Sequence, residues 1–239
     1  MKKDFIFPFL VSLILCLFIT RLVRRKRAQK KYRELIESVT SLHRGTPSER
    51  DLITQLLKYG FSSNAVFHDL YVKKNKTEFS QIDLVLATKQ GIIVFEVKDY
   101  KGWIFGNSNH TNWTQTLAFG KIKNRFYNPI KQNNNHVRYL KNTLEQFDQI
   151  PFYSVIVFYG DCVLKDINYV PKGTFIVKPH RVFEVIDLIT NNYEEAKYTD
   201  KEEIKNLLNS AVDIGNDNQI KEKHSSNIRE ILGKDRIYD

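Results

Sequence analysis

The fold is decided by residues 80–100, which read SQIDLVLATKQGIIVFEVKDY. Two runs within this stretch, 80–87 and 92–100, are dense in β-branched and aromatic residues and are predicted to be strands. The four residues between them are short enough to favour an antiparallel hairpin. In that hairpin the numbers of opposed residues sum to 179, which places Asp83 directly across from Glu96.

Two acids and a lysine then gather on one face of the predicted hairpin. Side chains alternate along a strand, so Asp83, Glu96 and Lys98 share a face. Because directly opposed like charges destabilise a sheet, two such acids favour a cation between them, and a carboxylate site with retained waters suits Mg²⁺ or Mn²⁺. The alternative is a solvated charged face, but such a face normally alternates polar residues throughout, whereas these acids interrupt apolar runs.

The rest of the chain predicts an α/β fold with a mixed central sheet of about five strands flanked by helices. The strand-like runs are 65–72, 80–87, 92–100, 153–160 and 174–178. Helices are predicted over 47–58, from Pro129 onward, and over 180–191 and 200–213. Thr46 with Glu49, and Thr199 with Glu202, form helix-start patterns for the first and last of these helices. Segment 101–128 is expected to hold further short strands.

The N-terminal 23 residues predict a transmembrane anchor. Residues 5–20 are uncharged and almost wholly apolar, and Leu22 and Val23 extend the run to 19, which just reaches spanning length. A cleaved signal peptide and a buried core helix are the alternatives. Two Lys/Arg precede the run and eight follow it by residue 33, so the positive-inside rule predicts a single-pass protein whose soluble body faces the cytoplasm.

The net charge of +10 is concentrated in the same region. Residues 1–33 hold ten Lys/Arg and one acid, and subtracting their +9 leaves +1 for the other 206 residues. Segment 24–45 is therefore predicted to be a basic juxtamembrane stalk that contacts anionic lipid, with an arm for nucleic acid as the alternative. A groove for nucleic acid in the soluble body would have to be locally basic. The two cysteines, Cys16 and Cys162, provide no disulfide framework and fit a reducing compartment.

Several motifs taken together resemble the nuclease-related domain (NERD) family, which is similar to a branch of the PD-(D/E)xK nuclease superfamily. They are Gln81-Ile82-Asp83, the run from Gly91 to Lys98, Gly102, Trp113 to Gln115, Asn128-Pro129-Ile130 and Gln132. The resemblance covers about residues 46–150. It implies a restriction-endonuclease-like core in a domain over 46–213, followed by a polar tail over 214–239.

The resemblance also implies a site. Asp83 matches the metal-binding Asp of the family, and Glu96 and Lys98 match its (D/E)xK pair, with the Val97 carbonyl as a further metal ligand. Glu49 matches an acid on the preceding helix, although Glu49 is equally explained by helix capping. Gln132 matches a Gln on the following helix, although it could be a solvated first-turn residue. His136 reads as a polar residue on the flank of that helix, and the tryptophans read as core.

The activity implied by this resemblance is Mg²⁺- or Mn²⁺-dependent phosphodiester hydrolysis by a membrane-anchored, cytoplasm-facing nuclease, with DNA as the expected substrate. Two alternatives from other classes stay open. A membrane-tethered binding or scaffold protein could keep the fold without turnover, which the near-neutral soluble body favours. A small-molecule hydrolase has no nucleophile motif such as GxSxG behind it.

Overall fold

The computed structural model describes residues 6–75, 77–217, 220 and 222. The chain divides into two units, residues 1–43 and residues 44–239. The first contains one helix, α1 (Ile6–Glu37), and the second contains the mixed α/β body. Most of the predicted polar tail, 214–239, lies outside the described residues.

The predicted anchor is not supported by the structure. No helix in the described part of the chain has a stretch that is both long and apolar enough to cross a membrane. The predicted span starts in residues 1–5, which lie outside the described residues, and the remaining apolar residues share the continuous helix α1 with the basic run that follows Val23. The predicted stalk is therefore the second half of this helix and a turn after Glu37.

The central sheet has five strands, as predicted, and their order is β1-β2-β3-β7-β9. Their bounds are β1 (Val66–Lys73), β2 (Phe79–Thr88), β3 (Gly91–Asp99), β7 (Phe152–Tyr159) and β9 (Thr174–Val177). The first three strands form an antiparallel meander, and β7 and β9 add to it in parallel. The predicted register is confirmed where Val85 pairs with Val94 and Ala87 with Ile92.

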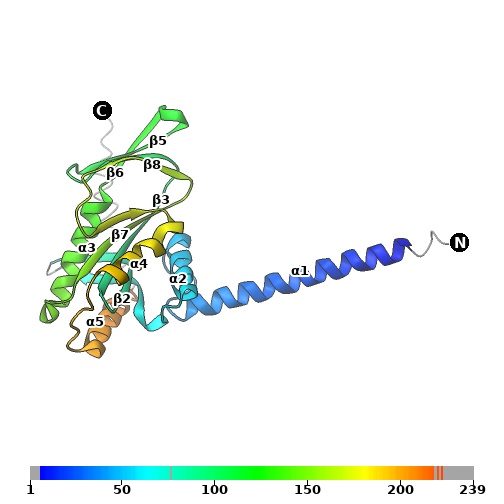
Figure 1. The fold of residues 1–239 in the computed structure, drawn as a ribbon, viewed down its shortest axis with the longest axis horizontal. Helices are drawn as coiled ribbons and strands as arrows, with labels where there is room; N and C mark the ends of the chain where they lie inside the picture. The colour runs from blue at the N-terminus through cyan, green and yellow to red at the C-terminus, as the bar shows by residue number, and fades with distance from the viewer. Residues whose placement is uncertain (1–5, 76, 218–219, 221, 223–239) are drawn as a thin grey trace. The chain divides into compact units, whose positions relative to one another are not determined.

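A second sheet has four strands in the order β6-β5-β4-β8 (Figure 1). Three of them lie in segment 101–128, where short strands were expected without bounds, and the fourth, β8, was not predicted. It consists of β4 (Gly102–Asn107), β5 (Asn112–Leu117), β6 (Ile122–Tyr127) and β8 (Cys162–Asn168). Two residues join β3 to β4, and two residues join β7 to β8. The adjacent inner strands β3 and β7 of the large sheet therefore lead directly into the small sheet.

Three of the four helices described in the α/β body begin at a residue whose side chain caps the helix. The helices of the body are α2 (Pro47–Tyr59), α3 (Pro129–Thr143), α4 (Val182–Asn192) and α5 (Lys201–Ile214). Short 3-10 helices span Ser63–Ala65, Ala118–Gly120, Glu145–Phe147 and Pro179–Arg181. Thr46 caps α2 as predicted, whereas α5 is capped by Asp200 and not by the predicted Thr199, because the Asp200 carboxylate reaches the N–H of Glu203.

The apolar core fixes which face of the large sheet each helix covers. Helices α3 and α5 pack on one face through a cluster that contains Leu140 and Leu208 and includes Val85 and Val94 from the sheet. Asp83 and Glu96 lie two residues from these valines and so project toward the same side. Helix α2 contacts β3 and adjoins α4, where the rings of Tyr59 and Phe183 stack at 4.2 Å between centroids.

Candidate active site

Asp83 lies where the strand ladders separate. The β2–β3 pairing runs from Thr88 only as far as Leu84 opposite Phe95, so Asp83 and Glu96 are not the ladder pair that the hairpin predicts. Instead, the Asp83 carboxylate takes the place of a strand partner, and its Oδ2 accepts a 2.7 Å hydrogen bond from the N–H of Val97. This bond holds the carboxylate at the start of the Glu96-Val97-Lys98 segment.

On the other side of Asp83, β1 is also irregular. Asp69 has a φ of 57°, a left-handed conformation that is uncommon outside glycine, and the β1–β2 pairs skip it. Arg44 stabilises this turn of the backbone, since its Nε lies 2.6 Å from Asp69 Oδ2 and its Nη2 donates to the Asp69 carbonyl. Gln81 donates to the other carboxylate oxygen at 2.6 Å. The strand pairing of β2 is therefore interrupted at Asp83 on both sides, toward β1 and toward β3.

The environment of Asp83 opposes its ionisation. Burial raises the pKa of the Asp83 carboxyl well above its ordinary value, and the negative charges of Glu96 and Glu49 raise it further. The Lys98 ammonium and the Val97 N–H act in the opposite direction without outweighing them. Three carboxylates are thus close enough to couple electrostatically, which is the situation that a bound cation relieves.

Glu96 and Lys98 form a buried ion pair. Glu96 is 1% exposed, and its Oε1 lies 2.6 Å from Lys98 Nζ. Burial alone would raise the pKa of Glu96, but the charge of Lys98 and the contact with His136 hold it below its ordinary value. Burial would lower the pKa of Lys98, but the Glu96 and Asp83 charges raise it, so the lysine stays charged. Gln132 of α3 accepts a 3.0 Å hydrogen bond from Lys98 Nζ, which fixes the ammonium.

His136, one helical turn after Gln132, faces the second oxygen of Glu96. The Ser80 hydroxyl lies 2.9 Å from His136 Nδ1 and orients the ring. His136 Nε2 lies 3.1 Å from Glu96 Oε2, yet the two groups are not aligned as a hydrogen bond. Within the part of the chain that the structure describes, neither of these buried atoms has a hydrogen-bond partner. Glu96 Oε2 is therefore an available ligand atom.

Glu49 caps α2, which is one of the two roles that the sequence left open, and its carboxylate also reaches the interior. It completes the cap of α2, because its N–H donates to Thr46 Oγ1 and its Oε1 accepts from that hydroxyl at 2.7 Å. Its Oε2 lies 3.0 Å from His68 Nε2 in the interior. Burial would raise the pKa of Glu49, but the contacts with His68 and Thr46 lower it. The carboxylate is thus kept charged near Asp83.

The described residues include no group of three or more His, Cys, Asp or Glu arranged to hold a metal ion. The chemistry of the donors nevertheless fits a hard divalent cation, since Glu96 Oε2 is buried without a hydrogen bond and Asp83 is coupled to two other carboxylates. Asp83 and Glu96 would be the ligands. The N–H of Val97 donates to the Asp83 carboxylate. The role of the Val97 carbonyl as a metal ligand stays a prediction.

Of the predicted site residues, Asp83, Glu96, Lys98 and Gln132 are brought together by contacts or by charge coupling, and Glu49 joins them through its effect on Asp83. His68 and Asp69 were missed. Both interrupt a predicted apolar strand, which is the signal that marked Asp83. His136 was noted as a flank residue, and its spacing of four from Gln132 was the signal that it shares the site. Trp113 is core, as predicted, at 1% exposed.

Comparisons with known proteins match the part of the chain that contains this site. Residues 44–159 match the family model described as nuclease-related domain (NERD). An uncharacterized protein of Bacillus anthracis is 29% identical over 160 residues, an alignment that covers 65% of this chain and 74% of the relative. No solved structure matches the chain. The matched segment begins at the arginine that holds Asp69 and ends with β7, so it contains the whole candidate site. Over the segment that contains the candidate site, the chain is therefore similar to the nuclease-related domain family.

Proposed function

We propose that this protein hydrolyses phosphodiester bonds in DNA with the help of Mg²⁺ or Mn²⁺. The observation that carries the proposal is the Asp83 carboxylate, set between separated strands and coupled to the buried Glu96–Lys98 pair. Carboxyl groups whose pKa is raised by burial and by neighbouring carboxylates cluster at functional sites.

Each side chain then has a defined task. A divalent ion held by Asp83 and Glu96 would polarise the phosphate and lower the pKa of a bound water. Lys98, fixed by Gln132, supplies a positive charge beside the reacting phosphate, where it orients the nucleophile and offsets the negative charge that develops. His136 and Ser80 hold the Glu96 carboxylate in place.

A binding or scaffold role without turnover is the second candidate. It is favoured by the near-neutral body, +1 outside residues 1–33, and by the ion pair that already satisfies Glu96 Oε1. The experiment that separates the two is incubation of the purified full chain with labelled DNA and RNA in Mg²⁺, in Mn²⁺ and in chelator. Metal-dependent cleavage of DNA supports the proposal, whereas nucleic-acid binding without cleavage in either metal supports the scaffold.

The raised pKa of Asp83 predicts a pH-dependent effect of Asp83→Asn on the metal-free protein. Because folding raises this pKa above its ordinary 3.8, the carboxyl favours the folded state at lower pH and loses that contribution as the pH rises through its folded value. Asparagine does not ionise and its amide oxygen can still accept from Val97. The melting temperature of Asp83→Asn relative to wild type should therefore rise as the pH is raised above 3.8.

Bound metal should reverse the difference in melting temperature between Asp83→Asn and wild type. A cation that binds only the folded state stabilises it by about 2.7 kcal/mol when free metal is a hundredfold above Kd. Wild type should gain melting temperature with Mn²⁺, and Asp83→Asn should gain much less. The exposed Asp148 provides a matched control, because Asp148→Asn should behave as wild type at every pH. Equal Mn²⁺ shifts in wild type and Asp83→Asn would mean that the metal binds elsewhere.

Membrane attachment and the cytoplasmic orientation of the body stay predictions. They rest on the Lys/Arg imbalance around residues 5–20 and on exposed apolar side chains of α1 such as Leu15, Leu17 and Phe18, which are 56%, 61% and 58% exposed. The full chain should fractionate with membranes, and a C-terminal tag should resist protease added to intact cells. Changing Leu15, Leu17 and Phe18 together to arginine should release the chain from the membrane fraction. A wild-type chain recovered in the soluble fraction would contradict the anchor.

A further inference from the structure

The small sheet has one face that is turned away from the core. Strand pairing places Trp103 opposite Thr116, and Thr116 opposite Lys123. The neighbouring positions of the other parity, which include Ile104, Trp113 and Phe126, lie in the apolar cluster beneath the sheet. Because side chains alternate along strands, one row forms an outer face. This row, which we call the outer face, consists of Trp103, Phe105, Thr114, Thr116, Lys123, Arg125, Val163 and Asp166. Lys165, at the irregularity in β8, also reaches the Trp103 ring.

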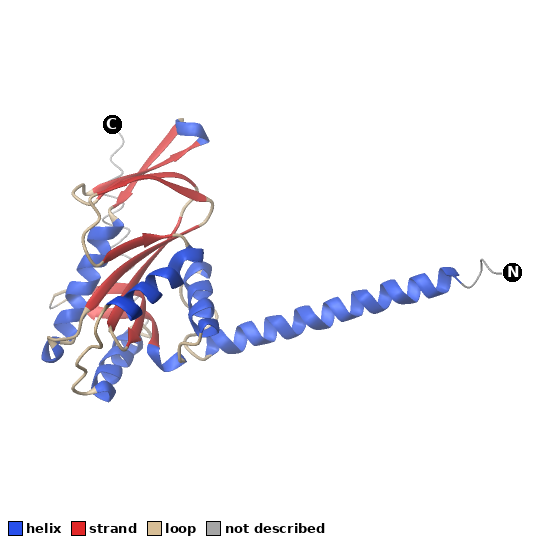
Figure 2. Ribbon diagram, viewed as in Figure 1, coloured by secondary structure: helices blue, strands red, loops and turns tan. Residues whose placement is uncertain are grey.

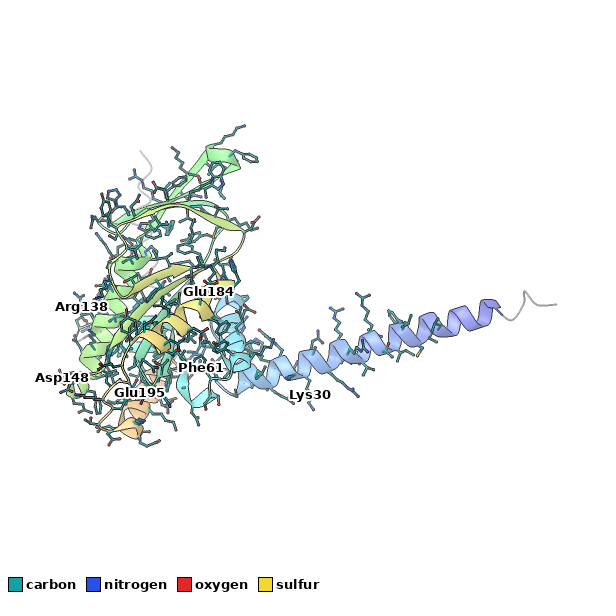
Figure 3. The ribbon with its side chains drawn as sticks, in the orientation of Figure 1. Lys30, Phe61, Arg138, Asp148, Glu184 and Glu195 are labelled. Atoms are coloured by element: carbon teal, nitrogen blue, oxygen red, sulfur yellow. The ribbon has the colours of Figure 1, made fainter. Side chains whose placement is uncertain are left out.

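The outer face supplies the local positive charge that the body as a whole lacks. Residues 100–144 contain seven Lys/Arg and no Asp or Glu, although the chain after residue 33 carries only +1. The edge strand β6 carries Lys123 and Arg125, and Lys121 immediately precedes it; all three side chains are exposed. The acids Asp161 and Asp166 lie just before and within β8, which is the opposite edge of the small sheet from β6. The positive charge is therefore concentrated along β6. Exposed Arg138 of α3 belongs to the same acid-free segment (Figure 3).

The hairpin that ends this face presents an aromatic ring on a strained backbone. Ala118 and Phe119 have φ values of 48° and 55°, and two consecutive non-glycine residues in the left-handed region are uncommon. Figure 2 shows this 3-10 turn at the tip of the β5–β6 hairpin. Phe119 is 93% exposed, so no packing within the body compensates for the strain. Strain of this kind is typical of functional positions.

Aromatic and basic groups alternate across the outer face. Lys165 Nζ lies 5.1 Å from the centre of the Trp103 ring. Between Trp103 and Phe119 is a pocket of about 320 Å³, whose walls are largely apolar and whose rim includes Lys101. A flat ring beside cations suits a nucleotide, whose base stacks on the ring while its phosphate pairs with the cation.

We propose that the outer face binds a single-stranded segment of nucleic acid, with phosphates along Lys121, Lys123 and Arg125 and bases against Phe119 and Trp103. The inference rests on the proposed function, because it describes how the substrate of that site is held. Strand β4 follows β3 after two residues, and five residues of extended chain from Lys98 reach no farther than about 18 Å, so Trp103 lies within a few nucleotides of the site. Aromatic side chains on a sheet favour a single strand over a duplex, whose bases are already stacked.

The test is the affinity of the purified full chain for a fluorescent oligothymidine, measured in chelator so that binding is independent of cleavage. A triple variant, Lys121→Ala with Lys123→Ala and Arg125→Ala, should bind at least tenfold more weakly at moderate salt. Its plot of log affinity against log salt should flatten by about 2, since each lost phosphate contact to a single strand contributes about 0.7. Phe119→Ala should weaken binding on the order of tenfold without changing this slope.

A charge-matched control removes three exposed lysines from elsewhere on the body, Lys58, Lys197 and Lys201, and should bind as wild type. Every measurement is repeated in a chain in which Arg24, Arg25, Lys26 and Arg27 are changed to glutamine. Nucleic-acid binding by this N-terminal cluster then cannot mask the effect of the variants. Wild-type affinity in the β6 triple variant, or tighter binding of a duplex than of the single strand, would overturn the inference. Loss of binding in that variant without any metal-dependent cleavage by wild type would leave the surface standing and contradict the proposed hydrolysis.

Discussion

Lys98→Ala should reduce the rate of metal-dependent DNA cleavage by a factor on the order of 10² to 10³ or more, which is the effect of removing one preorganised group that stabilises transition-state charge. The lysine is fixed by Gln132 and Glu96 and has its pKa raised by Glu96 and Asp83, so its charge is permanent at neutral pH. The rate is measured on labelled DNA in Mn²⁺. Lys58→Ala, an exposed change on α2, serves as the control and should keep wild-type activity.

Loss of activity must be separated from loss of folding, because Lys98→Ala leaves the buried Glu96 carboxylate without its partner. The double variant Lys98→Ala with Glu96→Gln removes both charges. It should regain much of the melting temperature that Lys98→Ala loses while staying inactive. Cleavage by Lys98→Ala at a rate close to that of wild type would show that the reaction does not use this lysine.

Arg44→Ala should lower the free energy of unfolding by about 3–5 kcal/mol, the typical cost of removing one partner of a buried ion pair. The Arg44 and Asp69 side chains are only 8% and 4% exposed. The same guanidinium donates to the carbonyl of Val212 and to the Asn216 side chain at 2.9 and 2.7 Å, so it ties β1 to the end of α5. Urea unfolding followed by circular dichroism measures the change.

The matched control for Arg44 is Arg181→Ala. Arg181 pairs with Glu184, but both side chains are 60% exposed, and solvent screens such pairs, so this variant should unfold close to wild type. If Arg44→Ala also unfolded close to wild type, the Asp69 turn would be held by other contacts. Because that turn opens the sheet beside Asp83, Arg44→Ala should also weaken the Mn²⁺-dependent gain in melting temperature.

The parts of the site that the sequence predicted are those with a local signal. Asp83 and Glu96 interrupt apolar runs on the two arms of one hairpin, and the Val85–Val94 pair confirms the register between them. The sequence could not show that the ladder stops one pair before Asp83. On the other side of β2, the irregular Asp69 is held by Arg44, which lies 25 positions away, and no local pattern encodes such a contact.

The strands of the fold were likewise predicted where the sequence carries a local signal. The five strands of the large sheet were apolar enough to be predicted. The small sheet consists of strands of six or seven residues with exposed polar positions, such as β6, in which five of six side chains are exposed. Its strands are defined by pairing across the sheet, including the parallel contact of β4 with β8. Parallel pairing between segments so far apart in the chain leaves no periodic signal in either one.

The most direct test of the central claim is the initial rate of phosphodiester cleavage by the wild-type full chain as a function of free Mn²⁺, measured beside a chelated sample. The Asp83, Glu96 and Lys98 site predicts a rate that rises and saturates with Mn²⁺, with half-saturation at the Mn²⁺ concentration that half-saturates the gain in melting temperature, and no cleavage in chelator. Cleavage that persists in chelator, or no cleavage of any DNA at saturating Mn²⁺, would contradict the account.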